Sequence, residues 1–347
     1  MRLSMILNYA HGPQALAEQV VGLERAGLDI VWVPEAYSID APSLMGFLAA
    51  KTSTIEIGSG ILPIYSRTPT LLAMTAAGVD LLSGGRCILG LGTSGPQVIE
   101  GFHGVPYDRP IGRTREVIEI CRKVWERAEP LVHNGTSYRI PVPAEQGTGL
   151  GKPLRMINHP LRSRIPIWVA AIGEQNVKLT AELAEGWLPV FYIPERGQEI
   201  FGAALADGAA KRSPELPPLE IAAGGAMAFS DDPDETTRLR DTARPQLALY
   251  VGGMGARGRN FYNTLVSRYG WEKEAALIQD LYLAGRKEEA AAAVPEDLLA
   301  ETTLIGSEGY LKDRLAAYRQ HGVTVLNVMP VGPNALEDVA RLKNLAS

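Results

Sequence analysis

The sequence predicts a (β/α)8 barrel that one domain forms over residues 1–347. Short apolar runs of strand length alternate with helical stretches, and eight such runs occur along the chain. The runs are continuously apolar, as expected for parallel strands that are covered on both faces. Eight strands with a helical cover after each can close into a barrel. The same alternation also permits a doubly wound open sheet, which is the alternative fold.

Proline and glycine mark where the first helices begin and end. Pro13 can open a helix that Gly27 closes, and between them Leu16, Val20 and Leu23 form one buried stripe at i, i+4 and i+7. A later helix begins at Pro69 and ends at 83–85, Ser-Gly-Gly. The strands are predicted at 3–9, 30–33, 55–61, 87–91, 165–171, 187–192, 219–229 and 323–329, and further helices at 41–51, from about 112, 174–185 and 335–345.

Two stretches interrupt this rhythm and are predicted to be insertions. Residues 130–164 are rich in proline, glycine and polar side chains, and they follow the fourth strand and its helix. Residues 231–302 are mostly helical and follow the seventh strand. Neither stretch has the composition of a flexible linker, so the whole chain is expected to form one domain.

Composition excludes several classes of function. Hydrophobic residues make up 46% of the chain, charged residues 21%, and the net charge is -5, which argues against a nucleic-acid partner. No apolar run approaches the roughly 18 residues of a membrane helix. The two cysteines form no disulfide framework, and the five histidines have no metal-type spacing, so we expect a cytoplasmic protein without a metal.

In a (β/α)8 barrel, function collects at the carboxyl ends of the strands. Glu35 follows the second predicted strand, and its carboxylate could accept hydrogen bonds from a cofactor ring. Ser59, Gly60 and Ile61 end the third strand, where glycines indicate a bulge or a close ligand contact. Thr93 lies in a glycine-rich turn after the fourth strand that lacks the immediate helix of a Rossmann site, and its hydroxyl could contact a ligand.

The fifth strand ends in a stretch that favours an anion site. Its small residues and the amides at the start of the next helix could hold a phosphate. The residues are Ala170, Ala171, Gly173, Glu174, Gln175 and Asn176. His11 and Tyr65 are candidate proton donors, while Arg67, Arg257 and Arg259 could meet an anionic substrate.

Taken together and in order, these motifs resemble the luciferase-like flavin-barrel superfamily, and within it the coenzyme F420-dependent oxidoreductases related to methylene-tetrahydromethanopterin reductase. The resemblance covers nearly the whole chain. It is carried by 32–35 (WVPE), 57–61 (IGSGI), 80–86 (DLLSGGR), 90–93 (GLGT), 170–173 (AAIG), 186–189 (GWLP), 250–255 (YVGGMG) and 260–262 (NFY).

The resemblance implies a cofactor ring resting on a bulge with a cis peptide at Gly60–Ile61. It also implies a cofactor phosphate near Thr93 and the amides of 173–176, a small-molecule substrate and a homodimer. The implied reaction is hydride transfer between coenzyme F420 and a carbonyl or unsaturated compound. Ala36 stands where several relatives place a functional histidine, and Gly95 where sugar-phosphate dehydrogenases of the family carry an acid. An FMN-dependent monooxygenase supplied by a separate reductase, and a flavin-binding barrel without catalysis, are the alternatives.

Overall fold

Eight parallel strands close into a barrel in the computed structural model, which describes residues 1–8 and 12–347. Each strand pairs with the next, and pairing of the last with the first completes the ring. The closed ring confirms the predicted (β/α)8 barrel, and the open-sheet alternative is wrong. The barrel strands are β1 (Arg2–Ile6), β2 (Ile30–Val33), β3 (Glu56–Ser59), β5 (Cys87–Gly92), β8 (Ile167–Val169), β9 (Gly186–Trp187), β10 (Glu220–Phe229) and β12 (Val325–Pro330).

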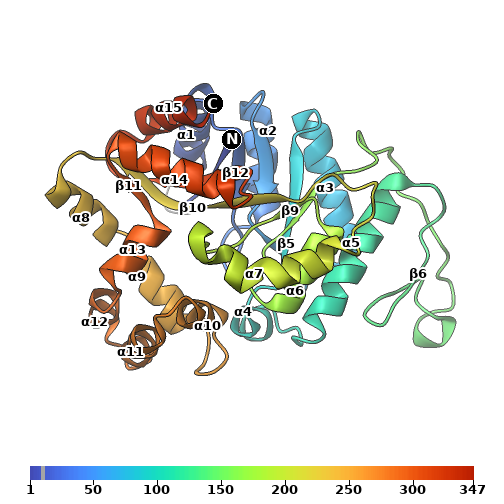
Figure 1. Cartoon of the computed structure of the whole chain (residues 1–347). Helices are drawn as coiled ribbons and strands as arrows, with labels where there is room; N and C mark the ends of the chain where they lie inside the picture. Colours follow the sequence, from blue (N-terminus) through green and yellow to red (C-terminus); the bar gives the residue numbers. More distant parts are fainter. Residues whose placement is uncertain (9–11) are drawn as a thin grey trace.

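Helices surround this ring (Figure 1). Several of them begin at the predicted residues because the local sequence fixes their ends. Asp40 and Thr68 each accept a hydrogen bond from an amide of the first turn that follows, and Gly84 ends its helix in the left-handed region with φ 69°. The covering helices are α1 (Pro13–Arg25), α2 (Ala41–Lys51), α3 (Pro69–Ser83), α5 (Pro110–Glu126), α6 (Glu174–Leu183), α7 (Pro194–Ala209), α14 (Glu308–Gln320) and α15 (Ala335–Ala346).

Two short strands extend the sheet beyond the eight expected from the sequence. β4 (Leu62–Pro63) follows β3 after a break and pairs with β5, whereas β11 (Leu304–Gly306) pairs with the end of β10. The strand predicted at 187–192 is observed only as Gly186–Trp187, because pairing with both neighbouring strands stops after Trp187. Residues 188–191 are half-buried, so the apolar sequence continues past the point where pairing stops.

The predicted insertions carry their own secondary structure. Within 130–164, β6 (His133–Asn134) and β7 (Arg139–Ile140) form an antiparallel hairpin, followed by the 3-10 turn η1 (Ala144–Gln146). After β10, most of the insertion is helical, and Figure 1 shows α9–α13 gathered on the same side of the barrel as α4 (Pro96–Gly101). Its elements are α8 (Pro233–Asp241), α9 (Arg244–Ala248), the π-helical turn η2 (Leu249–Gly253), α10 (Phe261–Arg268), α11 (Glu272–Leu283), α12 (Lys287–Ala292) and α13 (Glu296–Thr302).

Two tryptophans fill the inside of the barrel. The rings of Trp32 and Trp168 lie 5.2 Å apart and belong to a cluster with Ile30, Ile88, Ala222 and Val325. Glycines make room for them: a Cβ at Gly58 would lie 2.3 Å from the Trp32 ring, and one at Gly186 would lie 1.9 Å from Trp168. The glycines of the third strand are therefore required by packing inside the barrel.

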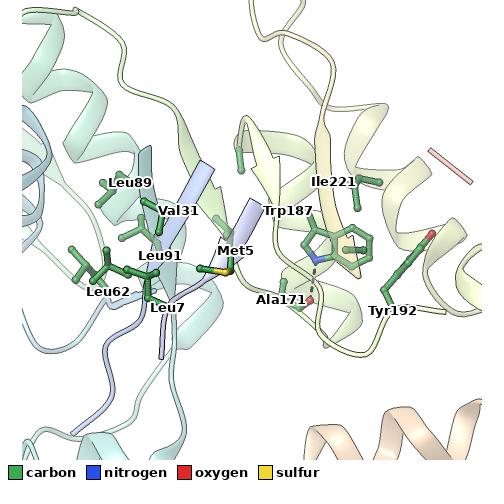
Figure 2. Close-up of a cluster of buried hydrophobic side chains, with 14 of the residues drawn as sticks. Met5, Leu7, Val31, Leu62, Leu89, Leu91, Ala171, Trp187, Tyr192 and Ile221 are labelled. Carbon is green, nitrogen blue, oxygen red and sulfur yellow. Dashed lines mark hydrogen bonds between the residues drawn. The ribbon is translucent and has the colours of Figure 1, made fainter. Parts of the chain in front are cut away.

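The larger core lies between the strands and the helices. Figure 2 shows apolar side chains of several strands meeting there, and the Trp187 indole donating a hydrogen bond of 2.9 Å to the Ala171 carbonyl oxygen. That bond fixes the end of β8, where the predicted anion site begins. In the part of the chain that the structure describes, no helix is both long and apolar enough to cross a membrane.

Candidate active site at the carboxyl ends of the strands

The end of the third strand has the backbone form that the family resemblance implied. The peptide between Gly60 and Ile61 is cis, and the Gly60 amide donates a hydrogen bond of 2.7 Å to the Val33 carbonyl oxygen. A Cβ at Gly92 would lie 2.7 Å from the Ile61 side chain. The strand end therefore packs tightly against β5, and only glycine fits beneath Ile61.

Ser59 does not present its hydroxyl to a ligand. The side chain is completely buried, and its hydroxyl donates to the Gly90 carbonyl oxygen and accepts from the Gly90 amide, both at 2.8 Å. Ser59 thus joins β3 to β5. Its expected contact with a cofactor is limited to the backbone.

Glu35 is engaged with a side chain of the protein. Arg67 donates to both carboxylate oxygens, at 2.5 and 2.9 Å, and the Ala41 amide at the start of α2 donates to one of them at 2.8 Å. The Glu35 side chain is only 6% exposed. Glu35 was expected to bind a cofactor ring and Arg67 to bind an anionic substrate. In the structure these two side chains form an ion pair with each other.

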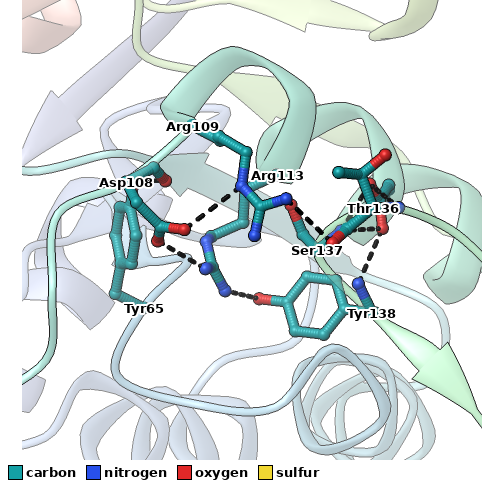
Figure 3. A network of polar contacts seen from close by, with 8 residues as sticks. Tyr65, Asp108, Arg109, Arg113, Thr136, Ser137 and Tyr138 are labelled. Carbon is teal, nitrogen blue, oxygen red and sulfur yellow. Dashed lines mark hydrogen bonds and ion pairs between the residues drawn. The ribbon is translucent and has the colours of Figure 1, made fainter.

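Tyr65 belongs to a polar network beside the site (Figure 3). Its hydroxyl donates to the Asp108 carbonyl oxygen at 2.8 Å, and its ring stacks on Tyr107 at 5.1 Å. Arg113 lies over the Tyr65 ring and also binds Asp108 and Tyr138. Burial raises the pKa of Tyr65 well above its ordinary value. The Tyr65 hydroxyl already donates a hydrogen bond within the protein, and its high pKa makes it a poor proton donor, so these contacts favour a structural role.

The remaining candidate side chains contribute less. His11 lies outside the described residues, so its predicted role as a proton donor remains a prediction. Arg257 pairs with Asp280 on the helical insertion. Among residues 1–8 and 12–347, no group of three or more His, Cys, Asp or Glu is arranged to hold a metal ion.

The start of α6 offers free backbone donors. The amides of Asn176 and Val177 donate to the Gly173 carbonyl oxygen, at 3.0 Å each. The amides of residues 173–175 have no hydrogen-bond acceptor among the described residues. The side chains of Glu174 and Gln175 are exposed, so these two residues offer their backbone rather than buried side chains. Free amides at a helix start favour an anion.

Two further polar groups belong to the candidate site. Asn176 is 8% exposed, and its Oδ1 has no hydrogen-bond partner within the described part of the chain. The Thr93 hydroxyl makes a long hydrogen bond, 3.3 Å, to the Ser94 carbonyl oxygen and also interacts with the Tyr107 hydroxyl. The Ala170 amide is engaged with the Leu91 carbonyl oxygen, which holds the ends of β5 and β8 together. Thr93 and the start of α6 therefore follow paired strands and can serve one ligand.

Aromatic side chains near this position were not predicted as site residues. Phe191 follows β9, Tyr250 belongs to η2, and Tyr262 lies in the first turn of α10, with ring centroids 4.8 to 6.4 Å apart. Phe261 comes within 3.8 Å of the Cβ position of Gly173. The sequence signal was the asparagine followed by two aromatic residues at 260–262, but nothing local shows that an insertion returns to the barrel mouth.

The fold and the site together define a (β/α)8-barrel protein with a candidate anion site at the carboxyl ends of β5 and β8. A model of the luciferase-like monooxygenase family matches residues 1–325. The chain belongs to this family, and the relatives below support an enzyme.

A Mycobacterium tuberculosis protein, provisionally named a coenzyme F420-dependent oxidoreductase, is 39% identical over 347 residues, covering 99% of both chains. The structure of the coenzyme F420-dependent tetrahydromethanopterin reductase from Methanopyrus kandleri superposes with a TM-score of 0.80 at 22% identity, covering 98% of this chain and 96% of that one. A Pseudomonas putida type II Baeyer-Villiger monooxygenase solved with FMN gives 0.65 at 17% identity, covering 98% and 96%. At these identities the two structures establish the fold alone.

Proposed function

We propose that this protein is an oxidoreductase that transfers a hydride between coenzyme F420 and a small organic carbonyl or unsaturated compound. The observation that carries the proposal is the group of free amides at 173–175, which follows β8, while Thr93 follows the paired strand β5. The 39% identical relative, whose provisional name refers to coenzyme F420, supports the choice of cofactor. FMN, which also carries a phosphate, is the alternative cofactor.

The residues present fit a phosphorylated cofactor with a flat ring. The free amides and Thr93 supply neutral donors for the phosphate. Gly60 and Ile61 are half-buried at the end of the third strand, where a ring could rest. A bound deazaflavin would supply a carbon centre that gives or accepts a hydride and does not readily activate oxygen.

The chain's own contribution to such a reaction is to bind and orient. Trp32 and Trp168 fill the barrel below the site, so the ligand is confined to the mouth. The Glu35–Arg67 pair fixes the start of α2 beside it. Correct positioning of two reactants lowers the barrier without a protein nucleophile.

Anaerobic titration of the purified protein with coenzyme F420 and with FMN tests the choice of cofactor. We expect micromolar binding of coenzyme F420, followed by hydride transfer that is visible as the loss of reduced cofactor when a ketone or enone is added. Binding of FMN alone would support the monooxygenase alternative, and tight binding without transfer to any acceptor would support a non-catalytic barrel.

Thr93→Val tests the position of the phosphate. Loss of one hydrogen bond to a charged group costs about 1.5–3 kcal/mol, so the Kd of coenzyme F420 should rise roughly tenfold or more. Thr237→Val, on the exposed side of α8, is the matched control, and its Kd should not change. Equal Kd values for Thr93→Val and the wild type would place the phosphate elsewhere.

A further inference from the structure

The helical insertion after β10 brings a rigid aromatic segment to the candidate site. Asn260 is 2% exposed and holds this segment together. Its Oδ1 accepts from the amides of Tyr262 and Asn263, at 2.9 and 3.1 Å, and its Nδ2 donates to the carbonyl oxygens of Tyr250 and Val251, at 2.9 and 3.0 Å. One buried side chain thus connects η2 to the first turn of α10.

The rings on this segment restrain one another. Tyr250 and Tyr262 pack edge to face at 4.8 Å and 85°, and Phe191 packs against Tyr250 at 5.4 Å and 83°. Phe191 itself is held in the left-handed backbone region, with φ 50°. The Tyr262 ring therefore has little freedom, and its hydroxyl is presented in a defined place.

The first turn of α10 lies across both halves of the predicted anion site. On one side, Phe261 is 3.8 Å from the Cβ position of Gly173, where the free amides begin. On the other side, Tyr107 is one of the groups that raise the pKa of Tyr262, so the two phenols lie in the same region. The Tyr107 hydroxyl in turn lies 3.4 Å from the Ser94 carbonyl oxygen, one residue after Thr93.

The Tyr262 hydroxyl is chemically suited to an anionic ligand. The half-buried Tyr262 side chain makes no hydrogen bond through its hydroxyl to the residues that the structure describes. Burial, reinforced by Tyr250 and Tyr107, raises the pKa of Tyr262 far above its ordinary value, so the phenol stays protonated and can donate. The Tyr262 hydroxyl is not among the fully buried polar atoms, so it is open to an acceptor that a ligand supplies.

We infer that Tyr262 is a ligand-binding residue whose hydroxyl donates a hydrogen bond to the phosphate of the bound cofactor. This inference rests on the proposed function in requiring a phosphorylated cofactor at the mouth, but it does not depend on which ring the cofactor carries. Tyr250 and Phe191 are positioning residues that hold the Tyr262 ring. The insertion thereby closes the phosphate side of the site, opposite the amides of α6.

Tyr262→Phe tests the inference because it keeps the ring and removes only the hydroxyl. The probes are FMN and riboflavin, which differ in the phosphate alone, and coenzyme F420 and its deazaflavin alcohol, which lacks both the phosphate and the acidic tail attached to it. For the ring system that binds, we expect the Kd of the phosphorylated member to rise about tenfold in the variant, which corresponds to one hydrogen bond to a charged group. The Kd of the unphosphorylated member should not change.

Tyr282→Phe is the matched control, since Tyr282 lies on α11 of the same insertion and packs against Gly252 and Gly253 on η2. It should leave every Kd unchanged, and both variants should retain the wild-type melting temperature. Equal weakening of both members of a pair, or no weakening, would overturn the role of Tyr262 while leaving the proposed function intact. If only FMN and riboflavin bind, and Tyr262→Phe raises the Kd of FMN but not that of riboflavin, the role of Tyr262 would be upheld and coenzyme F420 would be refuted as the cofactor. Failure of the wild type to bind any of the four compounds would refute both.

Discussion

At the scale of single residues, the Glu35–Arg67 pair shows that a side chain predicted to bind a ligand can instead form an ion pair within the protein. Both side chains are largely buried, with exposed fractions of 6% and 15%. A buried ion pair contributes little net stability, but removal of one partner leaves an unpaired charge away from water. Replacement of only one of the two side chains is therefore expected to lower the free energy of unfolding most.

We expect Arg67→Met to lower the free energy of unfolding by about 3–5 kcal/mol, because Glu35 would remain charged and unpaired. The double variant Glu35→Gln with Arg67→Met should recover part of this loss. Urea denaturation of the wild type, both single variants and the double variant gives the coupling energy. Additive single effects would show that the two side chains do not interact.

At the scale of elements, the β6–β7 hairpin is anchored by one carboxylate of α5. Glu116 accepts hydrogen bonds from the amides of Thr136, Ser137 and Tyr138 at 2.9 to 3.1 Å, and its Oε2 lies 3.2 Å from His133 Nε2. Burial by itself would raise the pKa of Glu116, but these hydrogen bonds outweigh it and lower the pKa below 4.5. The folded protein thus prefers the ionised carboxylate.

This preference predicts a pH dependence with a definite sign. A lowered pKa in the folded state gives stability that is fully present above pH 4.5 and is lost as the pH falls through the folded-state value. Glu116→Gln should therefore destabilise the protein at pH 7, by about 1–3 kcal/mol. The difference from the wild type should shrink in acid. Urea unfolding at pH 7 and pH 3.5 measures it, and a constant difference would contradict the hydrogen-bonded carboxylate.

Two glycines in different elements should respond oppositely to the same substitution. Gly58→Ala on β3 would place a Cβ 2.3 Å from the Trp32 ring, so we expect a loss of about 1–3 kcal/mol or more from overpacking. Gly78→Ala on α3 meets nothing within 4 Å and should gain up to about 1 kcal/mol from helix propensity. Thermal unfolding of both variants compares them. A stable Gly58→Ala would mean that Trp32 can move.

At the scale of the whole molecule, one outer helix presents an uncovered apolar stripe. Leu71, Met74, Leu81 and Leu82 are 45 to 68% exposed and recur on one face of α3, with the bare Gly78 among them. The only ionisable residue of α3 is Asp80, which is buried and paired with Arg162. A two-fold axis would place such a face against itself without bringing like charges together.

We therefore propose that two copies of the chain associate through α3, in agreement with the homodimer that the family resemblance implied. Light scattering after size-exclusion chromatography should give about twice the mass of one chain. Leu82→Glu would place two like charges in the interface and should shift the protein toward the monomer, whereas Leu283→Glu, at an exposed leucine on α11, should not. A wild-type monomer at micromolar concentration would contradict the proposal.

The sequence by itself determined the features that depend on short-range order. Helix starts at Pro69 and Ala41, the helix end at Gly84 and the continuous apolar strands follow from local capping and burial, so the barrel and the position of Thr93 and Gly173 at its mouth could be predicted. The short strand β11 could not be predicted, because three residues are too few to show a hydrophobic periodicity.

Only the tertiary structure decided which side chains at the mouth remain available. Ser59, Glu35 and Tyr65 each lie where the sequence placed them, yet each is held by a partner 31 to 43 residues away. Tyr262 reaches the same mouth from an insertion, and no local pattern reveals it. Local patterns are set by bonds and burial within a few turns, whereas side-chain partners across the barrel are fixed by the closure of the ring.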